Sequence, residues 1–113
     1  MFTNTQATAM LPAKDAARAK SWYADKLGLK PVEDFADNGA AYNLGGTRVF
    51  LYPTQFAGTA QHTVLTFNTD DLAVFYAARE ANGVTFTDPP RDIHGHSIAR
   101  FLDSEGAETS ISG

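Results

Sequence analysis

The sequence predicts an α+β domain in which one strand–helix–three-strand module (βαβββ) occurs twice. Two pairs of equivalent positions support the duplication: the strand residues Thr8 and His62, and the helix-ending glycines Gly28 and Gly83, are each separated by about 55 residues. Because the single helix of such a module covers one face of its sheet, the other face stays open. We therefore expect the two open faces to form a half-barrel around a central cavity, where a ligand would bind.

The length and composition fit a single globular domain. The chain has 113 residues, no cysteine and a formal net charge of −4, so it can fold without disulfides or a metal. Its basic residues are scattered along the chain, which disfavours nucleic acid as a partner. Neither a signal peptide nor an apolar run of the ~20 residues needed to span a bilayer is visible. We therefore expect a cytoplasmic protein that binds neither membranes nor nucleic acid.

The first module is expected over residues 5–53. Residues 5–13 alternate as a strand, and a helix follows with Asp15 as its N-cap and Gly28 as its left-handed stop. Three more short strands complete the module, and glycine-containing turns of the kind found in hairpins join them. These strands are expected at residues 32–36, 40–44 and 47–52.

The second module is expected over residues 62–113, after a linker at residues 54–61. It begins with a strand at residues 62–68, and Thr69 or Asp70 is expected to cap the helix that Gly83 ends. The later strands are expected at residues 84–87, 96–102 and 107–112. Residues 88–95, which contain two consecutive prolines, are expected to form an irregular insertion.

Four segments, in this order and spacing, resemble the vicinal oxygen chelate superfamily, the group that contains glyoxalases, bleomycin-resistance proteins and extradiol dioxygenases. They are TAMLPAKDAARAKSWYADKLGLKPV, GGTRVFLYPT, HTVLTFNTDDLAVFYAAREANGVTF and ARFLDSEGAETSI. The resemblance covers essentially the whole chain and implies the paired-module fold. It leaves the function open, because one fold can carry many chemistries.

The resemblance also implies where a metal would be held. Metal-dependent members of the superfamily use four inward His, Gln or Glu side chains, one from the first and one from the last strand of each module. These positions fall on Thr8, on His62, near Ser110 and around residues 50–52. Only His62 has a metal-binding side chain, and one imidazole cannot hold a catalytic ion that needs about three protein ligands. We therefore expect neither a metal nor another cofactor.

Strand alternation predicts the cavity lining if Thr8 and His62 point inward, since Met10, Val64 and Thr66 then do so too. The residues expected to contact a ligand are Thr8, Met10, Phe50, Tyr52, His62, Val64, His96, Phe101 and Ser110. Apolar walls with a few hydroxyls and an imidazole suit a flat aromatic or amphipathic ligand held by stacking.

Other side chains have simpler expected roles. Four aromatic residues at helical spacing are expected to pack the helices on the sheets: Trp22, Tyr23, Phe75 and Tyr76. In the linker, Phe56 is expected either to act as a lid or to pack on the surface. Glu105 and Glu108, in or beside the last turn, are expected to be solvated.

The hypothesis that we favour is a metal-free small-molecule binding protein. It is similar to the drug-sequestering branch of the superfamily, whose members are homodimers that hold an antibiotic in grooves shared between subunits, and we expect a homodimer here. The alternative is a glyoxalase-like lyase or dioxygenase with an atypical metal site, formed by His62 with His94 or His96. An isomerase that uses His62 alone as its base and a regulatory binder of a common metabolite also remain open.

Overall fold

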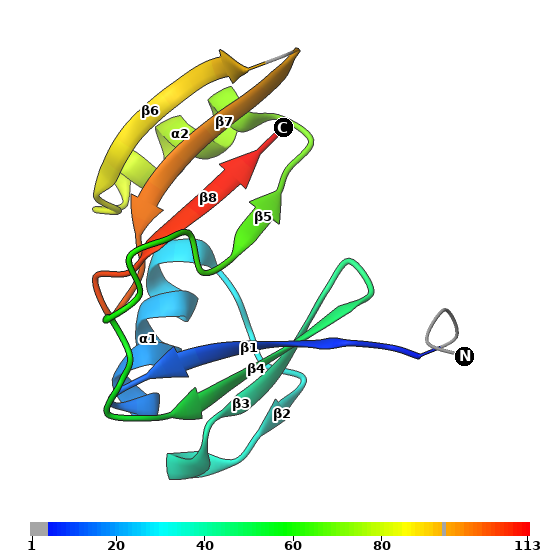
Figure 1. The fold of residues 1–113 in the computed structure, drawn as a ribbon, viewed down its shortest axis with the longest axis vertical. Coiled ribbons are helices and arrows are strands. Elements are labelled where there is room, and N and C mark those ends of the chain that lie inside the picture. Colours follow the sequence, from blue (N-terminus) through cyan, green and yellow to red (C-terminus); the bar gives the residue numbers. More distant parts are fainter. Residues whose placement is uncertain (1–4, 94) are drawn as a thin grey trace.

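The computed structural model describes residues 5–93 and 95–113, and it shows an α+β fold of two four-stranded sheets with one α-helix each (Figure 1). The elements of the first module are β1 (Thr8–Ala13), α1 (Ala16–Leu27), β2 (Glu33–Asp34), the 3₁₀ helix η2 (Ala36–Asn38), β3 (Ala40–Leu44) and β4 (Thr47–Pro53). Those of the second are β5 (Thr66–Asn68), α2 (Leu72–Ala81), β6 (Phe86–Ile93), β7 (His96–Leu102) and β8 (Glu108–Ser112). The predicted fold class is confirmed.

The two sheets have the same topology, as a duplication requires. Their strand orders are β1-β4-β3-β2 and β5-β8-β7-β6. In each module, the first strand along the chain (β1 or β5) pairs in parallel with the last (β4 or β8). The other neighbouring pairs are antiparallel. Strands β1 and β5 are therefore edge strands of two separate sheets. No helix in the described part of the chain is long and apolar enough to cross a membrane.

One hydrophobic core runs through both modules on the helix side of the sheets. Alternate strand residues, such as Leu11 and Leu51 in the first sheet and Phe101 and Ile111 in the second, point to this side. Tyr23 of α1 is buried here, as expected, while Trp22 and Phe75 are partly buried against the core. The opposite faces of the sheets stay open, and both are turned toward the viewer in Figure 1, where β1 passes in front of α1 and the strands of the second sheet pass in front of α2.

Both helices begin with an aspartate N-cap. The Asp15 carboxylate accepts a hydrogen bond from the Arg18 main-chain N–H at 3.1 Å, and Gly28 ends α1 at φ 71°, so both predictions for this helix are confirmed. The cap of α2 was predicted wrongly as Thr69 or Asp70. Asp71 has the extended backbone of a cap and accepts from the Val74 N–H at 3.2 Å, because the helix begins one residue later than expected.

The proline-containing segment at residues 88–95 was wrongly predicted to be an irregular insertion, because most of it belongs to β6. This strand is the outer edge of its sheet, and its register with β7 shifts between Phe86 and Asp88 and again between Asp88 and Arg91. Proline is tolerated at such positions for two reasons. The outward N–H groups of an edge strand form no hydrogen bond within the sheet, and a bulge leaves one residue unpaired.

Three predicted strands are shorter in the structure. In the segment predicted at residues 5–13, the strand begins at Thr8, and in the one at residues 62–68 only Thr66–Asn68 is a strand. The strand predicted at residues 32–36 is reduced to Glu33–Asp34. No helix or strand lies between Pro53 and Thr66. This irregular connection contains the predicted linker.

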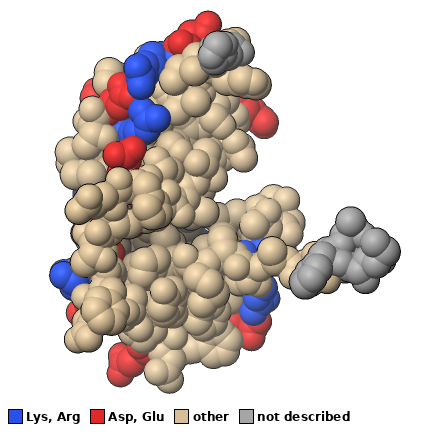
Figure 2. Space-filling view, in the orientation of Figure 1, with Lys and Arg blue, Asp and Glu red and all other residues tan. Residues whose placement is uncertain are grey.

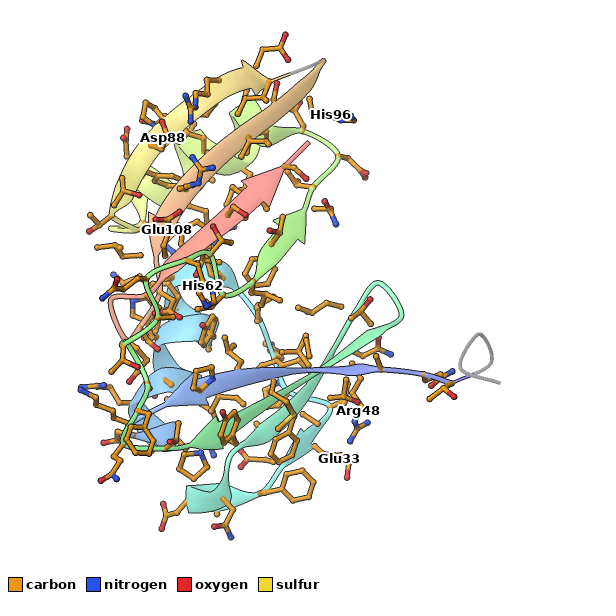
Figure 3. All side chains as sticks on the ribbon, viewed as in Figure 1. Glu33, Arg48, His62, Asp88, His96 and Glu108 are labelled. Carbon is orange, nitrogen blue, oxygen red and sulfur yellow. The ribbon has the colours of Figure 1, made fainter. Side chains whose placement is uncertain are left out.

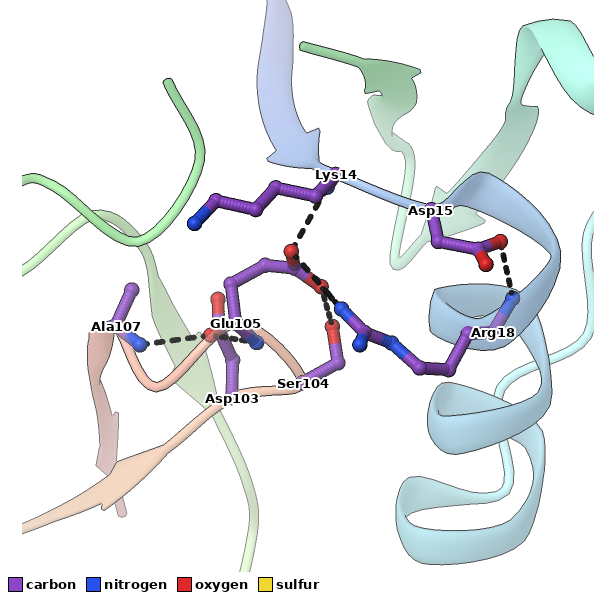
Figure 4. A network of polar contacts seen from close by, with 7 residues as sticks. All are labelled: Lys14, Asp15, Arg18, Asp103, Ser104, Glu105 and Ala107. Atoms are coloured by element: carbon purple, nitrogen blue, oxygen red, sulfur yellow. Dashed lines mark hydrogen bonds and ion pairs between the residues drawn. The ribbon is translucent and has the colours of Figure 1, made fainter. Parts of the chain in front are cut away.

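The loop between β7 and β8 joins the second module to the start of α1 (Figure 4). The Glu105 carboxylate accepts hydrogen bonds from the Lys14 main-chain N–H at 2.8 Å and from the Ser104 hydroxyl at 2.9 Å, and it pairs with the Arg18 guanidinium at 3.3 Å. Its side chain is only 1% exposed. The expectation of a solvated Glu105 was therefore wrong, because the turn packs against the first module instead of projecting into solvent.

The other end of α1 also contacts the second module, at the end of α2. The Asn82 side-chain amide donates to the Asp25 carbonyl at 2.6 Å, and the Lys26 ammonium donates to the Asn82 carbonyl at 3.0 Å. Arg79 adds a hydrogen bond to the Lys26 carbonyl at 2.9 Å. Helix α1 is thus fixed to the second module at both ends, which sets how the two modules lie against each other.

Candidate functional site

The open face of the first sheet is mainly apolar and aromatic. Strand pairing places Met10 beside Phe50 and Pro12 beside Tyr52, all on the face away from α1. The Phe50 ring packs against Phe35, with ring centroids 5.7 Å apart. Met10 is 56% exposed. This face offers aromatic and thioether surface to a ligand.

Polar groups border the same face at the start of β1. Thr8 is exposed and pairs in register with Arg48. The Arg48 guanidinium forms an ion pair with Glu33 at 3.0 Å, and both side chains are about half exposed. Figure 3 shows these two residues together at one end of the first sheet. The apolar part of the face therefore lies beside a neutralised charge pair.

The open face of the second sheet carries hydroxyl and amide groups. The Thr66 and Ser110 hydroxyls hydrogen-bond to each other at 2.6 Å across β5 and β8. One step further along, the Ser112 hydroxyl donates to the Asn68 side-chain oxygen at 2.6 Å. These groups form a short polar ladder on the face away from α2, in contrast to the aromatic surface of the first sheet.

A row of alternating charges crosses β6, β7 and β8 on the same face. Arg100 lies in its middle and pairs with Asp88 at 2.8 Å and with Glu108 at 3.1 Å. Arg91 pairs with Asp88 at 3.1 Å, and the Thr63 hydroxyl donates to Glu108 at 3.2 Å. Figure 2 shows the row as a stripe of alternating blue and red over the second module. Glu108, which we expected to be solvated, is held in these contacts.

Phe101 does not lie on the open face, and its prediction as a lining residue was wrong. Its side chain has no exposed surface and packs against Phe67 and Phe86, with ring centroids 6.3 and 5.7 Å apart. Alternation along β7 places Phe101 with Ala99 on the helix side, and Arg100 takes the open side. The prediction named both His96 and Phe101 in this strand, although alternation places the two on opposite faces.

The histidines are not brought together. His62 is exposed in the irregular segment before β5, with its Nδ1 atom 2.9 Å from the Thr63 carbonyl oxygen. His96 is exposed at the start of β7, and Figure 3 shows the two at opposite ends of the second module. His94 lies outside the described residues. Among residues 5–93 and 95–113, no three His, Asp or Glu side chains gather in a way that could hold a metal ion.

Val64 is also in the irregular segment before β5 and is half-buried. Its main-chain N–H donates to the Glu108 carbonyl at 3.0 Å. Because residues 62–65 do not form a strand, alternation cannot fix which way His62 and Val64 point. The assumption that they face inward together with Thr8 therefore has no strand to support it.

A groove of about 460 Å³ lies between the two modules, on the helix side of the first sheet. Its lining consists of Leu27, Leu29, Leu44, Gly45, Thr47, Val49, Leu65, Thr66, Phe67, Asn68, Thr69, Phe75 and Ile111. None of the nine predicted ligand-contacting residues is among them. The groove depends on how α1 is fixed to the second module, which strand alternation does not reveal. Thr66, which strand alternation predicted to face the cavity, is part of the lining, and the leucines on both sides of Gly28 were a further signal in the sequence.

Comparison with solved structures finds the same fold in several proteins. UcmS2 matches with 18% identity and a TM-score of 0.80, over 96% of each chain. TnmS3, an antibiotic binding protein from Streptomyces sp. CB03234, matches with 20% identity and a TM-score of 0.78, over 98% of this chain and 96% of that chain. Lactoylglutathione lyase from Agrobacterium tumefaciens matches with 17% identity and a TM-score of 0.77, over 96% and 92%. At these identities the likeness shows the fold alone.

The sequence itself places the chain in a family. A search of curated proteins finds no match, but the family model of the Glyoxalase/Bleomycin resistance protein/Dioxygenase superfamily matches residues 5–111. This span covers nearly the whole chain and both modules. The protein therefore belongs to that superfamily.

Proposed function

We propose that this member of the glyoxalase/bleomycin resistance protein/dioxygenase superfamily binds and sequesters an uncharged, amphipathic small molecule with an aromatic ring, such as an antibiotic, without converting it. The observation that carries the proposal is the division between the open faces. The first sheet offers Met10, Phe50 and Tyr52, whereas the second offers a ladder of hydroxyl and amide groups. A molecule with one aromatic and one hydrogen-bonding part matches both.

The aromatic part has a defined partner in Phe50. Its ring is already oriented by Phe35, so a further ring can stack on it or on Met10 with little loss of side-chain freedom. A ligand ring that buries about 150 Å² would contribute roughly 4 kcal/mol. This is about half of the −8 kcal/mol that corresponds to a micromolar Kd.

The polar part is expected to be uncharged. The charged row around Arg100 contains two arginines and two carboxylates that already neutralise one another. A charged ligand would have to displace one of these pairs. The Thr66 and Ser110 hydroxyls, in contrast, share one hydrogen bond and keep further acceptor capacity for a ligand.

Two of the structural relatives bear on the choice between binding and catalysis. The antibiotic binding protein TnmS3 and the lactoylglutathione lyase share this fold equally well. Fold alone therefore does not choose between the two functions. The preference for binding rests on the side chains of the open faces and on the wide separation of the described histidines His62 and His96 (Figure 3).

A twofold dimer is part of the proposal. Among residues 5–93 and 95–113, no segment buries the apolar part of the first open face, where Met10 is 56% exposed. Strand β1 is an edge of its sheet, and proteins usually cover or protect such an edge. A second copy that covers these surfaces would enclose a ligand between subunits and strengthen the otherwise shallow contact.

A titration of 2-naphthyl β-D-glucoside, which joins an aromatic ring to a polyol, tests the site. We expect saturable binding, and a Phe50→Ala variant should bind about tenfold more weakly, because it loses roughly 1.4 kcal/mol of stacking. The matched control is Val74→Ala, which trims a 64% exposed side chain on α2, far from the open faces. Equal affinity of Phe50→Ala and the wild type would contradict the proposed site.

A further inference from the structure

The groove between the modules lies apart from the aromatic face of the first sheet, and it shares only Thr66 and Asn68 with the polar ladder of the second. One wall comes from the end of α1 and the β3–β4 turn, with Leu27, Leu29 and Leu44. The other comes from β5 and the residues beside it, with Phe75 of α2 behind them. A volume of about 460 Å³ lies within the usual range for small-molecule sites, which is roughly 300–1,000 Å³.

The lining of the groove restricts the chemistry of an occupant. Every side chain that lines it is uncharged, and most are aliphatic or aromatic. A charged molecule would lose its hydration without gaining a partner charge. The occupant is therefore uncharged, with an aliphatic part of leucine-like size for the wall formed by Leu27, Leu29 and Leu44.

The main chain of β5 supplies the polar contacts. The five consecutive residues 65–69 all line the groove, as happens when the edge of a strand forms the wall. Towards β8, the Leu65 carbonyl accepts from the Ser110 N–H at 3.0 Å, and the Thr69 N–H donates to the Ser112 carbonyl at 2.8 Å. In a parallel pair these bonds alternate along the strand, so the N–H and C=O groups of Thr66 and Asn68 point away from β8, to the free edge.

We propose that this groove is a second ligand site, which takes a small uncharged amide with an aliphatic side group. The amide pairs with the outward main-chain groups of Thr66 and Asn68, as an added strand pairs with a sheet edge. The aliphatic group lies against the leucines of the first module. The two walls come from different modules, so a ligand in the groove also connects the two modules.

An NMR titration with N-acetyl-L-leucine methylamide tests the site. For a ligand of this size we expect a Kd of about 1 mM. The amide signals of Thr66 and Asn68 and the methyl signals of Leu29 and Leu44 should shift together. N-acetyl-L-leucine methyl ester, which lacks one donor, should bind about fivefold more weakly.

Two variants test the two walls. Leu44→Trp fills the groove and should abolish the shifts, and Asn68→Pro removes one outward N–H at a position where an edge strand tolerates proline, so it should weaken binding about fivefold. Phe50→Ala, on the open face, should bind the amide normally. Leu44→Trp should still bind 2-naphthyl β-D-glucoside, so the two sites can fail separately.

Several results would overturn the second site. One is a set of NMR shifts centred on Met10, Phe50 and Tyr52. Another is an absence of shifts up to about 10 mM probe, which is ten times the expected Kd. A third is a change in the amide signals of β5 when only the protein concentration is changed. The last result would mean that a second copy of the chain occupies the β5 edge.

Discussion

At the residue scale, the Glu105 carboxylate connects the two modules through three contacts at the loop between β7 and β8. It is buried, and it accepts hydrogen bonds from the Lys14 main-chain N–H and from Ser104 as well as pairing with Arg18. The sequence places Glu105 in a turn of polar residues, where solvation is the usual outcome. Its burial follows from contact with α1, a long-range feature that no local pattern reveals.

Replacing Glu105 by Ala should lower the free energy of unfolding by about 2 kcal/mol, because the Lys14 N–H, the Ser104 hydroxyl and the Arg18 guanidinium lose their common acceptor. Arg18→Ala, the control on the other side of the ion pair, should cost less than about 1 kcal/mol, because the guanidinium is 59% exposed. Urea unfolding of the three proteins measures both changes. Equal losses for the two variants would contradict the role given to the main-chain contact.

Asp103, two residues earlier, makes the stability depend on pH. Burial raises the pKa of its carboxyl, against hydrogen bonds from the Ala107 and Glu105 main-chain N–H groups that lower it. The folded protein then keeps this proton at a pH where the unfolded chain has lost it. The contribution of Asp103 to stability therefore falls as the pH rises above the ordinary carboxyl range of about 4.

Asp103→Asn removes this titration but keeps an oxygen that can accept from both N–H groups. Relative to the wild type, its free energy of unfolding should therefore increase between pH 4 and pH 7. Urea unfolding at both values measures the difference. A difference that is the same at both pH values would show that Asp103 titrates alike in the folded and unfolded states.

At the element scale, the sequence predicts helices and strands well where neighbouring residues in the chain determine them. It predicts them poorly where the position of a strand in its sheet determines them. The Asp15 cap and the Gly28 stop of α1 follow from residue type and helical spacing, and both are confirmed. The strand at residues 88–93 was missed because prolines usually argue against strands, and only its edge position makes them tolerable. Phe101 was assigned to the wrong face because alternation shows only that neighbouring side chains point to opposite faces. It does not show which of the two faces is buried.

The cap of α2 provides a test at this scale. Asp71→Ala should cost about 1 kcal/mol of stability, because the Val74 N–H loses its acceptor. Asp70→Ala, at the neighbouring exposed position, should change stability by less than about 0.5 kcal/mol. Thermal unfolding of the two variants side by side measures this contrast. A larger loss for Asp70→Ala would mean that the helix begins one residue earlier.

At the scale of the whole molecule, the two modules share a topology but differ in the chemistry of their open faces. The family and the paired-module fold could be predicted from four sequence segments. The groove between the modules could not, because it is built from residues of both modules that meet only when α1 is fixed at its two ends. Of the predicted ligand-contacting residues, Met10, Phe50 and Tyr52 do share one face of the first sheet.

The proposed dimer can be measured directly. Light scattering after size-exclusion chromatography should give about twice the chain mass of 12.2 kDa at micromolar concentration. Met10→Glu introduces a charge on the exposed part of the first open face and should shift the mass towards that of one chain. Val74→Glu, a matched change on the helix side, should leave the mass unchanged. A monomer at all concentrations would contradict the shared-groove arrangement.

The central claim is that the protein holds a small aromatic ligand without converting it. The most direct measurement is a time course in which a bound uncharged aromatic antibiotic is recovered after denaturation and analysed by mass spectrometry. Incubations with and without added iron, zinc, nickel or manganese should all return the antibiotic unchanged, in an amount equal to that added. Conversion of more than one equivalent per chain, with or without metal, would contradict the account and indicate an enzyme.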